Sequence, residues 1–92
     1  LMNQRELVEA VAQKTMIPRP QVAEVLAEAL GMIQEQVRQG EGVTLSGFGT
    51  FLPGKRKASK GFNPHTGKPI DLPELRVPKF RPGKGFKEKL KG

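Results

Sequence analysis

The sequence predicts an α+β fold with two N-terminal helices, a small antiparallel sheet that carries a long protruding β-hairpin arm, and a short C-terminal helix. Three observations support this fold class. Apolar residues recur every three or four positions up to about residue 40, as on amphipathic helices. Extended segments with alternating residues and many prolines follow. Among them, residues 55–70 (KRKASKGFNPHTGKPI) are basic, rich in turn formers and too poor in apolar side chains to fold alone.

The first helix is predicted at about residues 4–14. Asn3 followed by Glu6 has the spacing of an N-cap with a return acceptor three positions later. The apolar stripe behind this cap consists of Leu7, Val8, Ala10 and Val11.

The second helix is predicted to begin near Arg19 and to end at Gln39-Gly40. Pro18 and Pro20 fit only before or within its first turn, because each lacks an N–H donor. Glycine suits a left-handed C-terminal cap. Gly31 costs about 1 kcal/mol against alanine, and indicates either a tolerated defect or a close approach between helices. The apolar stripe is Val22, Val25, Leu26, Ala29, Leu30, Ile33 and Val37.

Two strands of the sheet are predicted after the helices. Val43–Ser46 alternates as a strand does, and Gly47–Gly49 turns the chain into a second strand at Thr50–Leu52. We expect Pro53-Gly54 to interrupt this strand with a bend or bulge, since proline cannot donate to the ladder.

A long hairpin and a weak terminal helix complete the chain. Glycine, asparagine and proline in Gly61–Gly67 predict a tight reversal between two extended legs. The returning leg is predicted at Pro69–Pro73 and Leu75–Phe80, and its prolines place it at a sheet edge. Arg81–Gly83 ends this leg, and Lys84–Lys91 has the composition of a short basic helix.

The positive charge is concentrated in the second half of the chain. The net charge is +7, made up of −2 over residues 1–41, +5 over residues 42–70 and +4 over residues 71–92. No acidic residue occurs between Glu41 and Asp71. Such a one-sided field attracts polyanions, and nucleic acid is the partner it favours; a solvated loop is the simpler interpretation.

The apolar residues at the hairpin tip allow two interpretations. Pro64 could set the turn or insert between base pairs as a wedge. Phe62 could pack on Pro69 or Ile70, or contact a sugar or base. His65 is expected to be an exposed tip residue, because its neighbourhood lacks further metal ligands.

Several function classes are excluded by composition. The chain has no cysteine and one histidine, so we expect no disulfide, metal site or other cofactor. No nucleophile–base pair, carboxylate cluster or phosphate-binding glycine loop indicates an enzyme or a small-molecule substrate. Charged residues in the first turns and the lack of a long apolar run predict a soluble, cytoplasmic protein with no membrane association. Met2 is the expected natural first residue.

At 92 residues the chain is expected to form a single domain that is poor in core residues. Apart from Phe62, its aromatic residues are Phe48, Phe51, Phe80 and Phe86. Because the chain has so few large apolar side chains for a core of its own, we expect a core shared between two chains in a two-fold homodimer.

Three motifs resemble those of the bacterial HU and integration host factor family. They are the Gly-Phe-Gly-Thr-Phe turn that begins at Gly47, the Asn-Pro-x-Thr-Gly tip that begins at Asn63, and the Pro-x-Phe-x-x-Gly-Lys segment that begins at Pro78. The resemblance extends from Met2 over nearly the whole chain. The matching positions are Phe48, Phe51, Arg56, Ser59, Gly61, Asn63, Pro64 and Thr66.

The resemblance implies an intertwined dimer whose two arms wrap DNA through the minor groove. In this interpretation residues 1–40 form a helical base, residues 41–54 and 72–82 a saddle-shaped sheet, residues 55–71 the arm, and residues 83–92 the last helix. Architectural proteins of this kind insert apolar wedges between base steps.

The resemblance also assigns roles to individual residues. Pro64 is the intercalating residue, and Phe48, Phe51 and Phe80 are the aromatic core of the dimer. Lys84 and Lys87 would reach flanking DNA, although a solvated face is the alternative. The expected DNA-binding set is Lys55, Arg56, Lys57, Ser59, Lys60, Phe62, Asn63, Pro64, Thr66, Lys68, Lys84 and Lys87.

Three arm positions depart from the family pattern. Ser59 and Phe62 stand where many relatives have arginine, and Lys68 stands where an acid is common. These departures affect the charge of the arm and its minor-groove contacts.

The function implied is nonspecific architectural binding and bending of double-stranded DNA in the nucleoid, with preference for bent, nicked or flexible duplexes. Leu45–Gly49 and Phe80–Gly83 favour a sequence-preferring subunit like integration host factor. A ribosomal-type RNA-binding protein is the alternative of another class.

Overall fold

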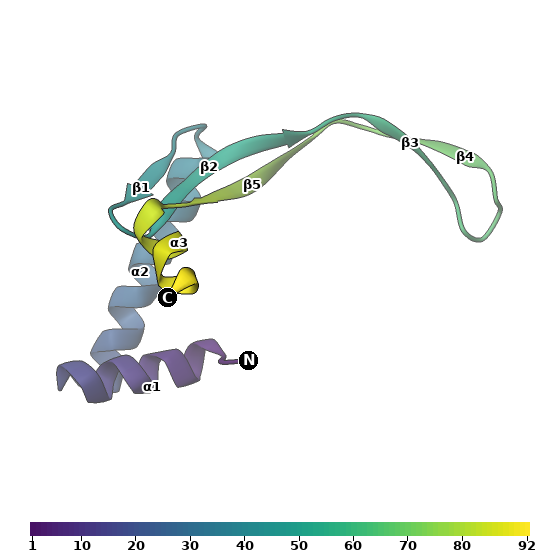
Figure 1. The fold of residues 1–92 in the computed structure, drawn as a ribbon. Coiled ribbons are helices and arrows are strands. Elements are labelled where there is room, and N and C mark those ends of the chain that lie inside the picture. The colour runs from purple at the N-terminus through teal and green to yellow at the C-terminus, as the bar shows by residue number, and fades with distance from the viewer. The chain divides into compact units, whose positions relative to one another are not determined.

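The computed structural model describes residues 1–92 and has the α+β architecture that the sequence predicts (Figure 1). It divides into two compact units, residues 1–35 and 36–92. None of its helices combines the length and the apolar composition needed to cross a membrane. In chain order the elements are α1 (Gln4–Thr15), α2 (Arg19–Arg38), β1 (Val43–Leu45), β2 (Gly49–Arg56), β3 (Ser59–Phe62), β4 (Pro69–Leu72), β5 (Leu75–Pro82) and α3 (Lys84–Lys91).

Helix α1 is capped at both ends. The Asn3 Oδ1 atom accepts a hydrogen bond from the backbone N–H of Glu6 at 2.8 Å, which confirms the predicted N-cap. At the other end the N–H of Met16 donates to the carbonyl of Ala12 at 2.9 Å. Met16 adopts a left-handed conformation with φ of 62°, an arrangement that glycine adopts at lower cost.

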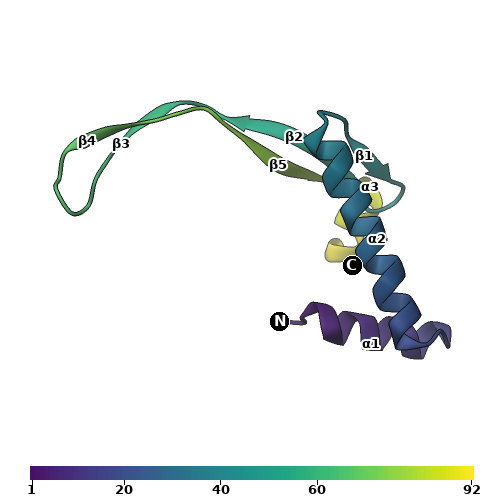
Figure 2. The same ribbon diagram turned by 180° about the vertical axis from the view of Figure 1, so that it is seen from behind.

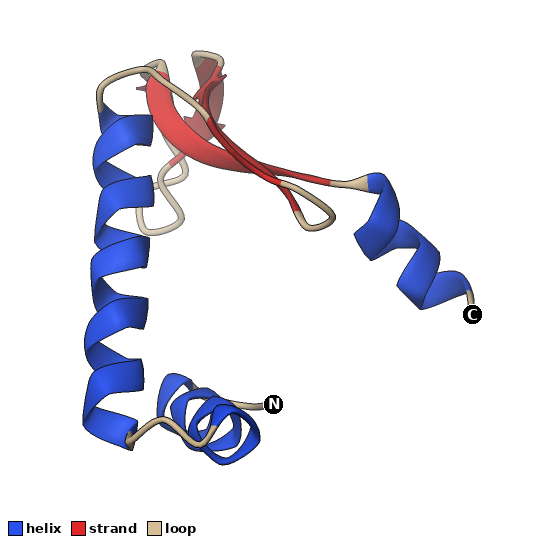
Figure 3. Cartoon of the chain, turned by 90° about the vertical axis from the view of Figure 1, so that its left-hand side faces the viewer, coloured by secondary structure: helices blue, strands red, loops and turns tan.

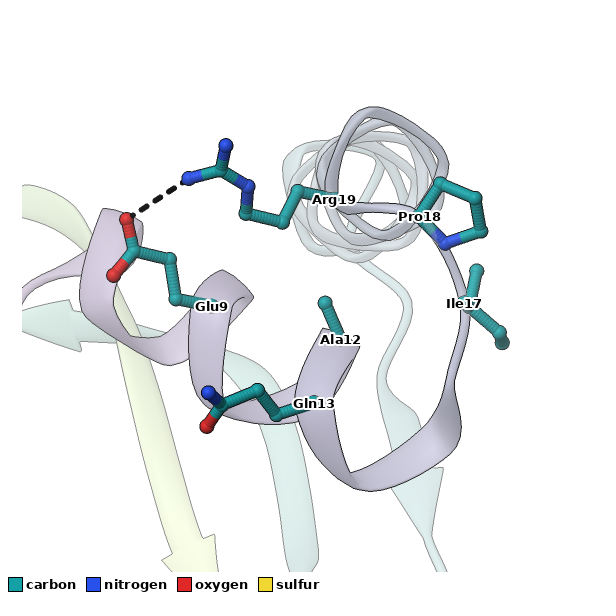
Figure 4. Close-up of a pocket in the computed structure, with 6 residues that line it drawn as sticks. All are labelled: Glu9, Ala12, Gln13, Ile17, Pro18 and Arg19. Atoms are coloured by element: carbon teal, nitrogen blue, oxygen red, sulfur yellow. Dashed lines mark hydrogen bonds and ion pairs between the residues drawn. The ribbon is translucent and has the colours of Figure 1, made fainter.

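The helical unit has a very small core. Val8, Ala12 and Val22 are buried, and Leu26 packs against them. At the surface, the Arg19 guanidinium lies 3.3 Å from Glu9 and links the start of α2 to α1 (Figure 4). Much of the apolar stripe of both helices stays exposed, including Leu7, Val11, Val25 and Leu30.

The C-terminus of α2 is closed by glycine, as predicted. Gly40 has φ of 94°, and its N–H donates to the carbonyl of Val37 at 3.0 Å. The N–H of Glu41 donates to the carbonyl of Gln36 at 2.9 Å, so two of the last carbonyls find partners. A Cβ atom on Gly31 would meet nothing within 4 Å, so no close approach within the chain explains this glycine.

The body of the second unit is a three-stranded antiparallel sheet in the order β1-β2-β5. The predicted interruption at Pro53-Gly54 is wrong, because β2 continues to Arg56 without a bulge. Pro53 lies directly opposite Pro78, and Gly49 lies opposite Pro82. In an antiparallel ladder every second pair exchanges no hydrogen bonds, so prolines that share these pairs cost no donor.

The arm is a separate two-stranded ribbon formed by β3 and β4, seen extending beyond β2 and β5 in Figure 2. It begins only at the Ser59–Leu72 pair, whereas the body ladder ends at the pair of Arg56 with Leu75. The break therefore falls at residues 57–58 and 73–74. The proline-rich strand β5 is an edge strand, as expected, and α3 follows it directly (Figure 3).

Candidate nucleic-acid interface

The tip of the arm is held by a compact set of hydrogen bonds. The N–H of Asn63 donates to the carbonyl of Lys68 at 2.8 Å, and the N–H of Gly67 donates to the carbonyl of Asn63 at 2.7 Å. The N–H of Lys68 also donates to the Thr66 hydroxyl at 3.3 Å. Gly67 has φ of 70°, which explains glycine at this position.

Asn63 has a structural role in this turn. Its side-chain Oδ1 accepts the backbone N–H of His65 at 2.8 Å and so bridges Pro64. Pro64 and His65 are both exposed at the end of the ribbon. The turn therefore exposes the Pro64 ring at the end of the ribbon, and both oxygens of Asn63 already accept a backbone hydrogen bond.

Phe62 lies next to this turn and remains largely uncovered. It stands directly opposite Pro69 in the β3–β4 ladder, yet 68% of its surface is exposed. Packing within the arm therefore covers only a minority of the ring. A phenyl group that is left in water so close to an exposed proline is suited to contact with an apolar part of a ligand.

The five cations of residues 55–68 that are expected to bind DNA occupy three different parts of the second unit. Lys60 and Lys68 are exposed on the ribbon, and Lys57 lies between the two ladders. Lys55 and Arg56 belong to the body sheet and not to the ribbon.

Two carboxylates lie close to these cations. Asp71 stands directly opposite Lys60 in the ribbon. Glu74 lies 3.6 Å from the Lys55 ammonium, with both side chains more than half exposed. Such an exposed pair contributes little to stability, so a phosphate can replace Glu74 at low cost.

Four phenylalanines pack together on the body of this unit. The ring centroids of Phe51 and Phe80 are 4.9 Å apart, and Phe48 lies 5.5 Å from Phe80. Phe86 joins them at 5.2 Å from Phe48, although the predicted aromatic core did not include it. Phe48 and Phe80 are still 43% and 41% exposed, so the cluster leaves apolar surface uncovered in the single chain.

Helix α3 is placed by close contact with the β1–β2 turn. A Cβ atom on Gly85 would lie 3.1 Å from the carbonyl oxygen of Gly47, which explains glycine inside this helix. The N–H of Gly83 donates to the carbonyl of Phe48 at 2.8 Å. Lys84 and Lys87 are exposed on the helix that these contacts hold.

Sequence reasoning did not single out Arg76 on β5. Its guanidinium donates to the carbonyls of Arg38, at 2.7 Å, and Val37, at 3.4 Å, at the end of α2. A cation at a helix C-terminus is favourable because the unpaired carbonyls carry partial negative charge. No local pattern reveals this contact, since 38 residues separate Arg76 from Arg38.

The whole chain matches a known protein family. The match to the family described as bacterial DNA-binding protein covers residues 2–91. This chain belongs to that family. It is 46% identical to the DNA-binding protein HU of Thermotoga maritima, over 98% of this chain and 100% of that relative. It is 47% identical to the DNA-binding protein HU of a Nostoc species, over 97% and 95% of the two chains.

Solved structures of bacterial HU proteins share this fold. The Anabaena HU–DNA cocrystal structure superposes with a TM-score of 0.93 at 47% identity, over 97% of each chain. The structure of HU from Thermotoga maritima gives a TM-score of 0.69 at 34% identity, over 97% of this chain and 98% of that one.

Proposed function

We propose that this chain is an architectural protein of the bacterial nucleoid that binds and bends double-stranded DNA as a homodimer, largely without regard to sequence. The observation that carries the proposal is an exposed two-stranded arm that presents lysines and an apolar tip, on a fold that also occurs in an HU–DNA cocrystal. Its family consists of DNA-binding proteins and not of enzymes.

Phosphate contact supplies most of the affinity in this proposal. The exposed cations Lys57, Lys60 and Lys68 lie along the arm, and Arg56 lies at the end of the body ladder next to it. Lys84 and Lys87 add charge from α3. Neutralising phosphates releases condensed counterions, so the logarithm of the affinity falls with the logarithm of salt by about 0.9 per phosphate contacted. Phosphate contacts carry no sequence information, so sequence preference is weak.

Pro64 bends the duplex by inserting between two base pairs. Its ring stands exposed at the end of a turn that the Asn63 side chain braces. Phe62 and the Asn63 amide lie beside it and contact the adjacent sugars and minor-groove edges. Unstacking one base step costs a few kcal/mol. This cost is lower in bent, nicked or flexible DNA, so such duplexes bind more tightly.

A second copy of the chain completes the body. The phenylalanine cluster of Phe48, Phe51, Phe80 and Phe86 leaves apolar surface in water, as do Val25 and Leu30 on α2. Clustered exposed apolar side chains of this kind mark protein–protein interaction sites. Burying them in an intertwined homodimer provides the missing core and supplies two arms to one duplex.

Binding of the protein and of Pro64→Ala to intact and nicked duplexes of one sequence, over a salt series, tests this proposal. We expect the protein to prefer the nicked duplex, and Pro64→Ala to lose that preference while keeping its salt slope. Pro69→Ala is the matched control, because this proline lies in the ladder and not at the tip. If neither duplex is preferred and Pro64→Ala binds as the unmodified protein does, the arm binds DNA by charge alone and Pro64 does not insert.

Two competition experiments separate this function from the others considered. Site DNA against random DNA distinguishes it from a sequence-preferring subunit, and duplex RNA against duplex DNA at fixed salt distinguishes it from an RNA-binding protein. We expect little preference in the first and a preference for DNA in the second.

A further inference from the structure

The body ladder of β2 and β5 has two faces of different chemistry. Residues opposite each other in an antiparallel pair share a face, and alternate pairs point to opposite sides. One face carries the pair of Phe51 with Phe80 and the pair of Lys55 with Arg76. The other, which we call the open face, carries the pairs Thr50–Arg81, Leu52–Lys79, Gly54–Val77 and Arg56–Leu75.

The open face is basic and contains no acid. It presents Arg56, Lys79 and Arg81, all exposed, and none of the three strands of the sheet contains aspartate or glutamate. On the phenylalanine face, by contrast, Arg76 is hydrogen-bonded to the end of α2, and Lys55 lies beside Glu74. The cations that are not engaged within the sheet body therefore gather on the open face.

Gly54 directs the side chain of one of these cations. An ideal Cβ atom on Gly54 would lie 2.5 Å from Cε, 2.6 Å from Cδ and 2.7 Å from Cγ of Lys79. The Lys79 stem thus occupies the space that a side chain at position 54 would fill. Because Gly54 pairs with Val77, the stem runs diagonally across the ladder in the direction of the arm. Arg56, two residues beyond Gly54 on β2, lies on the same face.

We propose that Lys79, laid across Gly54, binds a backbone phosphate of duplex DNA that passes over the open face. The glycine is a positioning residue, because it provides the groove that holds the lysine stem against the sheet. A lysine that is already ordered loses less side-chain entropy when it binds than a freely rotating one. This inference rests on the proposed DNA-binding function and adds a body contact to those of the arm.

The direct test is the salt dependence of duplex binding by the full chain and by Lys79→Gln. We expect the slope to become shallower by about 0.9 for each protomer that contacts DNA, as for the loss of one phosphate contact. Lys14→Gln removes the same charge from the last turn of α1, and we expect it to leave the slope unchanged. Lys79→Arg keeps the charge and should retain the slope.

A second variant tests the role of the glycine. Gly54→Ala displaces the Lys79 stem without removing any charge, and its φ is compatible with alanine. We expect Gly54→Ala to weaken duplex binding a few-fold in the parent chain and to have no effect in the Lys79→Gln background. Thermal denaturation of each variant confirms that the fold is intact.

The outcomes separate the two proposals. If the unmodified protein binds duplex DNA but Lys79→Gln keeps the full salt slope, Lys79 contacts no phosphate and the inference is wrong. The same holds if Gly54→Ala weakens binding equally in both backgrounds. If the unmodified protein shows no salt-dependent binding to duplex DNA, the proposed function itself is wrong.

Discussion

The two antiparallel ladders of this chain are continuous in sequence but differ in what supports them. The β2–β5 ladder has eight pairs, a third strand on one side, a phenylalanine cluster on one face and Arg76 bonded to the end of α2. The β3–β4 ribbon has four pairs, and two of its three large apolar residues, Phe62 and Ile70, are 68% and 41% exposed. An isolated two-stranded ribbon is marginally stable in water. We therefore expect most of the folding free energy to come from the body, and the arm to gain its order from the ligand it binds.

Removing one phenylalanine from each region gives the largest expected contrast. Phe80→Ala deletes a ring at the centre of the aromatic cluster and should lower the free energy of unfolding by about 3 kcal/mol. Phe62→Ala removes the same ring from an exposed position and should change it by less than about 0.5 kcal/mol. Urea unfolding at one protein concentration measures both. Equal losses would show that the arm is part of the folding unit.

Two glycines with positive φ provide a smaller, backbone-only contrast. Gly47 (φ 76°) lies in the turn of the body and Gly67 (φ 70°) in the tip of the arm, and a Cβ atom on either would meet nothing within 4 Å. Alanine at Gly47 should therefore cost about 1 kcal/mol of global stability through backbone strain alone. Alanine at Gly67 should leave global stability unchanged and reduce duplex binding. A loss of thermal stability in Gly67→Ala would contradict the separation of the two regions.

The contact of Arg76 on β5 with the end of α2 gives a contrast of similar size. Arg76→Met removes two hydrogen bonds to carbonyls at a helix C-terminus and should cost about 1 kcal/mol. Arg81→Met removes the same charge from the opposite face of the same strand, and should change the unfolding free energy by less than about 0.5 kcal/mol. Denaturant unfolding of the two variants side by side checks this. Matching losses would mean that only the net charge matters.

Local signals were sufficient to predict most of the elements. Asn3 followed by Glu6 predicted where α1 begins. Pro18 and Pro20 predicted where α2 begins, and Gly40 predicted where it ends. These signals are reliable because caps and prolines act within one helical turn. The hairpin tip was predictable for the same reason. Turn formers specify their own backbone conformation.

Features that depend on distant residues were not predictable from local pattern. Pro53 predicts an interrupted strand from local pattern, but the register pairs it with Pro78, at a position where the strand can continue. Glycine is unfavourable inside a helix, and only the nearby Gly47 carbonyl explains why Gly85 occurs in α3. The packing of Phe86 in the aromatic cluster and the contact of Arg76 with α2 also depend on residues that are distant in the sequence. In each case the partner lies elsewhere in the sequence and only the tertiary fold brings it near.

Amide hydrogen exchange of the two ladders, with and without duplex DNA, tests the central claim most directly. We predict that the amides of β2 and β5 exchange slowly in both conditions, because their ladder is part of the folded body. The amides of β3 and β4 should exchange fast in the free protein and become protected when DNA is added. Strong protection of the arm without DNA, or fast exchange that persists in the complex, would contradict an arm that gains its order from the DNA it binds.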